Sequence, residues 1–138
     1  MALFPWSNRN PWGNTIGGGD ANYSSSGDPF DQGTTPVGYY DGGQSPSGPN
    51  RANGYGLYDM AGNVWEWCWD WHDSVWYDNA GATTQDTRDP NTSASGVRVL
   101  RGGSWNDFAS GSLRCASRSS VDPVIEGSYI GFRSARGL

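Results

Sequence analysis

The chain has 138 residues and carries fourteen acidic side chains against nine basic ones, all of them arginine, for a formal net charge of −5. This length predicts a single domain over residues 1–138 with a core of modest size. Because no basic cluster is present, neither a nucleic acid nor an anionic membrane surface is an expected partner. No apolar stretch reaches transmembrane length, so membrane insertion is not expected. The first ten residues lack the pattern of a signal peptide, and the sequence leaves the cellular compartment open.

Glycine and aromatic residues dominate the composition. The chain contains 21 glycines and eight prolines, and 14% of its residues are aromatic. Disordered chains are poor in aromatic residues, so this combination predicts a folded, loop-rich domain anchored by large rings. Turn-forming residues are frequent as far as residue 53, and long helices are not expected.

Three strands are predicted, separated by loops. Residues 56–62 form a short helical turn or a tight loop, after which alternating tryptophans predict a strand within residues 62–73. A polar loop over residues 78–95 leads to a second strand within residues 97–105, and the last strand lies within residues 128–136. Strands this short, joined by loops this long, indicate that function resides on the loops.

The first strand raises the question of a buried charge. Its indoles occupy every second position from residue 65 to residue 71 and therefore lie on one face, with Glu66 on the other. A carboxylate that faces inward needs a partner, because burying an unpaired charge is costly. Asp59, the carbonyl groups of the 62–64 turn and Glu66 supply closely spaced oxygens of the kind that calcium prefers. An ordinary ion pair between Glu66 and an arginine is the alternative.

Few residues are suited to catalysis. Cys68 and Cys115 have neither metal-ligand nor disulfide-framework spacing, so they are two separate thiols or a pair that the fold brings together. The single histidine, His72, cannot form a facial metal triad alone, and no nucleophile signal accompanies it.

Several motifs carry a resemblance to a known family. They are NGYGLYDMAGNVWEW at 53–67, RVLRGGSW at 98–105, LRCASR at 113–118 and IGFR at 130–133, with PWGN at 11–14 and ANY at 21–23. In these motifs the chain resembles the formylglycine-generating enzyme or sulfatase-modifying family. The resemblance implies an α+β domain with a C-type lectin fold in its formylglycine-generating-enzyme variant, with short strands, long ordered loops and little helix. The family's upstream part is expected to be missing.

The resemblance also implies two calcium cages that brace the loops. The first matches Asp59 and Glu66 by side chain and Gly62 and Val64 by backbone carbonyl. The second matches Asn22, Tyr23, Asp28 and Phe30, although the stretch that follows Asp28 is one residue longer than in the family. The expected cofactor is therefore structural calcium.

Catalysis by the family depends on two cysteines shortly after the GGS motif, where a thiolate pair binds copper. Here the corresponding segment, residues 105–113, contains no cysteine, and Cys115 lies beyond it. An enzyme is therefore not the leading expectation. A formylglycine-generating oxidase or another metalloenzyme of this family, and a non-catalytic structural fragment of it, are the alternatives.

The C-terminal part resembles the variable region of diversity-generating retroelement proteins, here residues 98–138. In that class, fixed framework residues alternate with variable positions, whose codons are rewritten at template adenines. The residues at these variable positions, here called filling positions, belong to the set that such rewritten codons can encode, except Glu126. This resemblance implies a ligand-binding display domain that contacts a protein or a glycan through residues 105–129, with self-association left open. The expected ligand-binding residues are Asn106, Asp107, Phe108, Ser110, Ser112, Cys115, Ser117, Ser119, Ser120, Val121, Val124, Ile125, Gly127, Ser128 and Tyr129.

Overall fold

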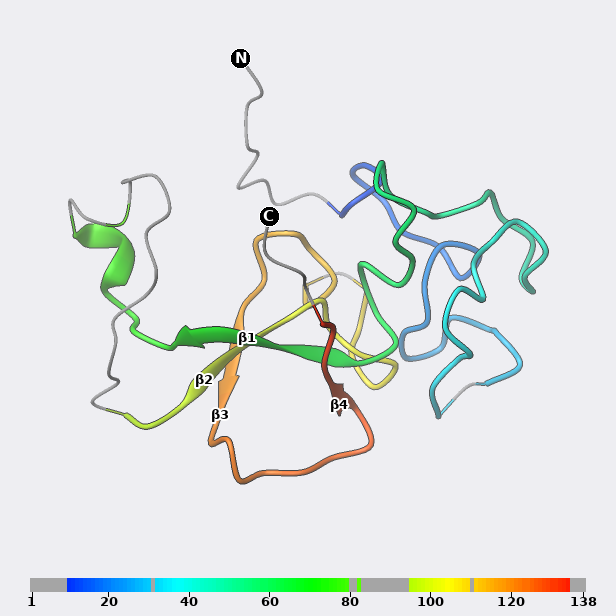
Figure 1. Ribbon diagram of the computed structural model, residues 1–138. Coiled ribbons are helices and arrows are strands. Elements are labelled where there is room, and N and C mark those ends of the chain that lie inside the picture. The colour runs from blue at the N-terminus through cyan, green and yellow to red at the C-terminus, as the bar shows by residue number, and fades with distance from the viewer. Residues whose placement is uncertain (1–9, 31, 80–81, 83–94, 110, 135–138) are drawn as a thin grey trace, which may run out of the picture.

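A small curled sheet forms the centre of the molecule. The computed structural model describes residues 10–30, 32–79, 82, 95–109 and 111–134. Strands β1 (Trp65–Trp71), β2 (Arg98–Arg101), β3 (Ser119–Val121) and β4 (Ile130–Gly131) are ordered β3-β2-β1-β4. The β1–β2 and β2–β3 pairs are antiparallel, whereas β1 and β4 run parallel (Figure 1).

The tryptophan strand is confirmed, and its indoles differ in burial. Glu66 pairs with Arg101 and Trp67 with Leu100, but the register then shifts before Trp71 meets Arg98. The alternation of large apolar and polar residues favours an extended strand, and the irregularity lets the two strands separate locally. Trp65 is therefore buried at 8% exposure, whereas Trp69, within the irregular part, is 78% exposed.

The predicted low helix content is confirmed, whereas the predicted strand limits need correction. Helix in the described residues consists of the 3-10 turn η1 (Trp76–Asp78) and a further 3-10 residue at Ala82, so the α+β class is not established. Residues 56–62 form a tight loop of bends and irregular backbone. The last strand is shorter than predicted because β4 pairs only with the start of β1. Strand β3 was not predicted, since its Ser-Ser-Val sequence has weak strand propensity and its pairing with β2 decides its conformation.

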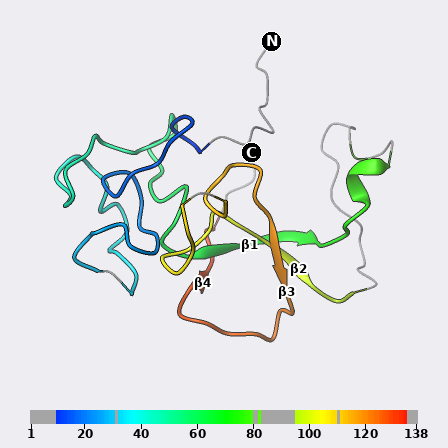
Figure 2. The same ribbon diagram turned by 180° about the vertical axis from the view of Figure 1, so that it is seen from behind.

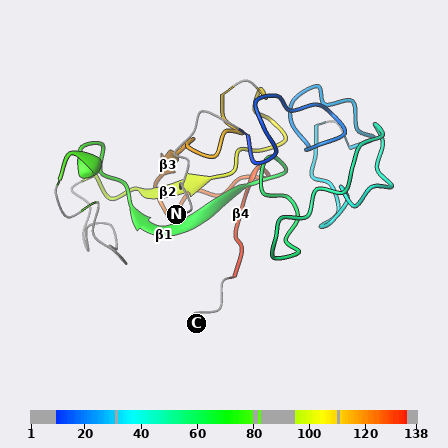
Figure 3. The ribbon, with the colours of Figure 1, turned by 90° about the horizontal axis from the view of Figure 1, so that it is seen from above.

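Loops pack against one end of the sheet and bury most of the small core. Residues 10–62 lie beyond the start of β1, while η1 lies beyond its other end, in all three views (Figures 1, 2 and 3). Ala21, Ala61 and Leu113 form the centre of this packing, each at most 2% exposed, with Trp12 and Tyr23 among the rings against them. No helix among the described residues is long and apolar enough to cross a bilayer.

One turn, residues 59–63, holds the loops and the sheet together. Asp59, Gly62 and Asn63 all have left-handed backbone conformations, with φ of 56°, 76° and 66°. A Cβ atom on Gly62 would lie 2.1 Å from the carbonyl oxygen of Asn22, so only glycine fits there. The amide of Gly62 donates to the Gly102 carbonyl and the amide of Asn63 donates to that of Asn22, at 2.8 and 2.9 Å. The turn is therefore the junction of segments distant in the sequence.

Candidate functional site: a cavity beside the central turn and an exposed loop surface

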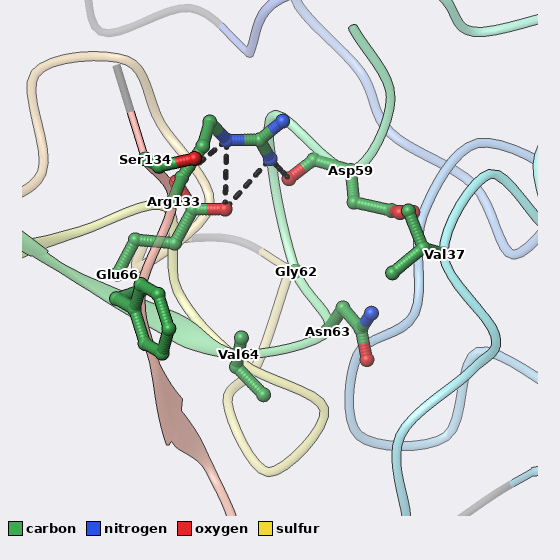
Figure 4. A pocket seen from close by; sticks show the side chains of 9 residues that line it. Val37, Asp59, Gly62, Asn63, Val64, Glu66, Arg133 and Ser134 are labelled. Atoms are coloured by element: carbon green, nitrogen blue, oxygen red, sulfur yellow. Dashed lines mark hydrogen bonds and ion pairs between the residues drawn. The ribbon is translucent and has the colours of Figure 1, made fainter. Parts of the chain in front are cut away.

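The central turn borders a cavity of about 320 Å³. Glu66 and Arg133 meet on one side of it in Figure 4, where the backbone carbonyl of Asp59 also faces Arg133, whereas the Asp59 carboxylate extends toward Val37. The Asn63 amide points away from the charged groups and binds the backbone of Thr35. Its Oδ1 accepts from the Thr35 amide at 3.1 Å, and its Nδ2 donates to the Thr35 carbonyl at 3.3 Å. This role of Asn63 was not predicted, because only the folded chain brings Thr35 beside it.

Glu66 has an arginine as its partner. The Arg133 Nε donates to both carboxylate oxygens at 3.1 and 3.0 Å, and its Nη2 donates to Oε1 at 2.6 Å. Nη2 also donates to the carbonyls of Tyr58 and Asp59, at 2.9 and 3.2 Å. The hydrogen bonds to Glu66 raise the pKa of Arg133. Of the two partners that the sequence left open for Glu66, the structure therefore contains the ion pair.

Asp59 is short of partners. Its Oδ2 accepts from the Gly38 amide at 3.0 Å, whereas its Oδ1 is buried and accepts no hydrogen bond. Burial raises the pKa of Asp59, and the nearby Arg133 only partly offsets that effect. A buried carboxylate oxygen without a donor is costly, so this atom is suited to a bound cation.

The second group of predicted calcium ligands makes more hydrogen bonds within the protein. Asp28 Oδ1 accepts from the Phe30 amide at 2.8 Å, and its Oδ2 accepts from the hydroxyls of Ser26 and Tyr40 at 2.5 and 3.3 Å. The Tyr23 carbonyl accepts from the Ser26 amide. Asn22, which is 1% exposed, has a buried Oδ1 without a donor. One orphaned oxygen therefore lies in each predicted cage.

These contacts decide how a cation fits. Among the described residues, no three His, Cys, Asp or Glu side chains gather as a metal site. A cation in the first predicted cage would therefore depend on the orphaned oxygen of Asp59, and a cation in the second on that of Asn22, each together with backbone carbonyls. Oxygen ligands of this type suit calcium. Asp59 and Asn22 fit that group. The Glu66 carboxylate does not, because the guanidinium of Arg133 already binds both of its oxygens.

The predicted ligand-binding residues are accessible but do not form one face. Connections 111–118 and 122–129 leave opposite ends of β3, which separates them (Figure 1). None of the fifteen that lies in the described part is buried, and Ser110 lies outside the described residues. The exposed ones are Asn106, Phe108, Cys115, Val124, Ile125, Ser128 and Tyr129, and the half-buried ones are Asp107, Ser112, Ser117, Ser119, Ser120, Val121 and Gly127.

Fixed contacts hold the backbone of the 105–109 loop. The amide of Trp105 donates to the Asn63 carbonyl at 2.9 Å, and its indole Nε1 donates to the Ser128 carbonyl at 3.3 Å. Asp107 Oδ2 accepts from the amide and the hydroxyl of Ser104, at 3.0 and 2.5 Å. Asp107 is therefore engaged inside the loop, and the bond between Trp105 and Ser128 joins this loop to the 122–129 connection.

The thiols are separate. Cys68 is half-buried and Cys115 exposed, and both are free. Burial raises the pKa of each thiol, more than the nearby Arg101 lowers it. Raised pKa values favour the neutral thiol, which is a poorer nucleophile and metal ligand than the thiolate.

Comparison with known proteins places the chain in a family. Residues 2–138 match the Sulfatase-modifying factor enzyme 1-like domain. The chain belongs to that family. The serine/threonine-protein kinase pkn1 of Chlamydia caviae is 43% identical over 131 residues, which cover 94% of this chain and 18% of the relative. The formylglycine-generating enzyme of Mus musculus is 38% identical over 143 residues, covering 96% and 33%.

A solved structure confirms the second resemblance. Treponema denticola variable protein 1 superposes with a TM-score of 0.56 and 36% identity, over 81% of this chain and 34% of that protein. The chain thus spans between 18% and 34% of the length of these three proteins. The predicted relationship to the formylglycine-generating-enzyme family and to a variable protein is confirmed.

Proposed function

We propose that the chain is a ligand-binding display domain, and that a protein or glycan is held by the loops at 105–109 and 122–129. The observation that carries this proposal is the exposure of four large apolar side chains on two hydrogen-bonded loops. Phe108 is 74% exposed, Val124 79%, Ile125 45% and Tyr129 39%. Rings and aliphatic groups supply contact area, and neighbouring Ser and Asn residues supply adaptable hydrogen bonds, as in antibody paratopes.

The anchors of these loops lie apart from the exposed positions. Ser104 and Leu113 are each 1% exposed, and Asp107 ties the loop to Ser104. Exposed substitutions usually change stability by less than about 0.5 kcal/mol, whereas losing a buried Leu costs about 2–5 kcal/mol. The outward residues can therefore change while the backbone stays in place. The similarity to a variable protein supports this reading.

Calcium is the structural cofactor that we propose for this scaffold. Asp59 and Asn22 supply the orphaned oxygens, and the carbonyls of Gly62, Val64, Tyr23 and Phe30 complete the proposed ligand sets. The bound ion would neutralise Asp59 and tie loops that have little apolar core of their own.

The test is a pair of libraries on the intact chain. One randomises the exposed residues Asn106, Phe108, Val124, Ile125, Ser128 and Tyr129, and the other randomises the anchors Ser104, Asp107 and Leu113. We expect most of the first library and little of the second to melt cooperatively near the wild-type temperature. Selection of the first library against immobilised lysozyme should also yield binders. Equal loss of folding in both libraries, or no binders from a folded library, would refute the proposal.

Retroelement diversification makes a separate prediction about the gene. A reverse-transcriptase gene and a near-copy of the segment that encodes residues 100–133, differing only at adenines, should lie nearby. Their absence would remove the diversification part and leave the binding surface to be judged by the libraries.

An oxidase is the second candidate, favoured by the 38% identity to a formylglycine-generating enzyme. Against it stand the lack of cysteine in residues 105–113 and the raised pKa of both thiols. Incubation with copper and a cysteine-containing sulfatase peptide distinguishes the two functions, because aldehyde formation would establish the enzyme.

A further inference from the structure

A second, smaller cavity lies where the loop layer meets the proposed binding surface. It has a volume of about 130 Å³ and is lined by Ser24, Ser25, Gln32, Trp105 and Asn106. Ser24 is held against the 105–109 loop, here called the display loop, because its amide donates to the Asp107 carbonyl at 2.9 Å. The cavity therefore combines residues of the N-terminal loops with two residues of the display loop.

The lining is polar but uncharged. The five lining residues carry two hydroxyls, two side-chain amides and an indole, and none of them is acidic or basic. Hydroxyl and amide groups both donate and accept hydrogen bonds. A carboxylate or phosphate ligand would find no cation here, and an ammonium ligand would find no anion. The lining instead matches a neutral ligand whose own groups also donate and accept.

Two residues at this cavity have left-handed backbone conformations. Ser25 and Gln32 have φ of 65° and 73°, and they are two of the four non-glycine residues with positive φ in the described part of the chain. The other two are Asp59 and Asn63, which border the larger cavity. Such conformations cost free energy and cluster at ligand sites, where the surrounding structure maintains them.

Two hydrogen bonds hold the Trp105 residue in place. Trp105 is tethered through its backbone amide to Asn63 and through its Nε1 to Ser128. A rigid ring offers an apolar face at low entropic cost, while the hydroxyls and amides around it can bind polar groups at the ligand's edge. A volume below the roughly 300 Å³ of drug-sized pockets limits the occupant to one small unit.

We propose that this cavity is a subsite for one neutral sugar residue of a glycan, with the ring of Trp105 as its platform. This inference rests on the proposed function and names the glycan as its ligand class. The side-chain amides of Gln32 and Asn106 and the hydroxyls of Ser24 and Ser25 hydrogen-bond the sugar hydroxyls. Because Asn106 is a filling position and the other four residues are not, its replacement alters which sugar is held.

The test uses the full chain and neutral methyl glycosides of glucose, galactose, mannose, fucose and the N-acetylhexosamines. Binding is measured by saturation-transfer NMR and by titrating the Asn106 side-chain amide signals, which are assigned from their loss in Asn106→Ala. We expect at least one sugar to bind with a millimolar Kd and to shift those signals. Ser25→Gly and Gln32→Gly keep the left-handed backbone and remove only the side chains, so each should weaken binding about tenfold.

Controls separate this inference from the proposed function. Ser74→Gly changes an exposed serine outside the cavity and should leave sugar binding unchanged. Binding of no sugar, or binding that is equally strong in Ser25→Gly, Gln32→Gly and Asn106→Ala, would overturn the subsite. Stronger binding of glucuronate or of free amino acids than of the neutral glycosides would also overturn it. The selection of lysozyme binders would stand in each of these cases.

Discussion

Replacing Asn63 tests whether the central turn holds the domain together. In Asn63→Ala the buried Thr35 amide and carbonyl lose their side-chain partners. Each unsatisfied group costs about 1–3 kcal/mol. The left-handed φ of 66° costs a non-glycine, non-asparagine residue about 1–2 kcal/mol more. We therefore expect a loss of about 3–8 kcal/mol, a large part of the 5–15 kcal/mol that stabilises a typical domain.

Two companion variants divide this loss into its causes. Asn63→Gly loses the same hydrogen bonds but adopts positive φ freely, so it should be about 1 kcal/mol more stable than Asn63→Ala. Asn63→Asp keeps the acceptor for the Thr35 amide but places a buried carboxylate oxygen against the Thr35 carbonyl, so it should be at least as unstable as Asn63→Ala. Urea unfolding followed by tryptophan fluorescence, with unchanged m-values, measures all three. An alanine variant within about 0.5 kcal/mol of wild type, the usual effect of a neutral surface change, would refute this account of the turn.

Four further predictions concern charged groups. Burial raises the pKa of Asp59 in the folded chain above its value in the unfolded chain. With a chelator present, the contribution of Asp59 to stability is therefore complete below the unfolded-state pKa and is lost as the pH rises through the folded-state pKa. Asp59→Asn should reduce this fall of the melting temperature with rising pH. Saturating calcium, at about 100 times Kd, should stabilise the wild type by about 2.7 kcal/mol for each occupied site. Asp59→Asn should lose the contribution of the Asp59 site alone in the same melts, and no shift in wild type would argue against the ion. A double-mutant cycle of Glu66→Gln and Arg133→Gln should give a coupling free energy of about 1–2 kcal/mol. This value is at the lower end for a hydrogen-bonded pair because both side chains remain partly exposed to solvent. A coupling free energy near zero would contradict the ion pair. Arg98→Gln removes a guanidinium that lies 3.9 Å from the Trp71 ring centroid, so urea unfolding should show a loss of about 1 kcal/mol, and an unchanged midpoint would rule out that contact.

Local sequence was sufficient for the loop-rich character and for the two central strands. The alternation of β1 and the apolar Val99 and Leu100 of β2 reflect properties of adjacent residues, and both strands formed where they were expected. Strand β3 could not be predicted, because serine residues there are extended only by pairing with β2. The division of the predicted binding residues into two groups follows from that missed strand.

The partner of Glu66 depended on long-range pairing. The parallel β1–β4 contact places Gly131 opposite Glu66, and it brings Arg133, two residues farther along, to the carboxylate. Nothing near Glu66 in the sequence identifies which arginine arrives. The small polar cavity was missed for the same reason, since Ser24, Gln32 and Trp105 are distant in sequence and carry no motif of their own.

The turn at residues 59–63 also has a consequence for how the molecule acquires its structure. Its hydrogen-bond partners come from both directions along the chain, at Asn22 and Thr35 on one side and at Gly102 and Trp105 on the other. Each of these contacts requires a long loop to close, and the entropy cost of closure precedes the free energy that the complete set of contacts provides. Folding should therefore be slow for a protein of this size. Until the last of these contacts forms, the tryptophan-rich surface remains exposed and can aggregate.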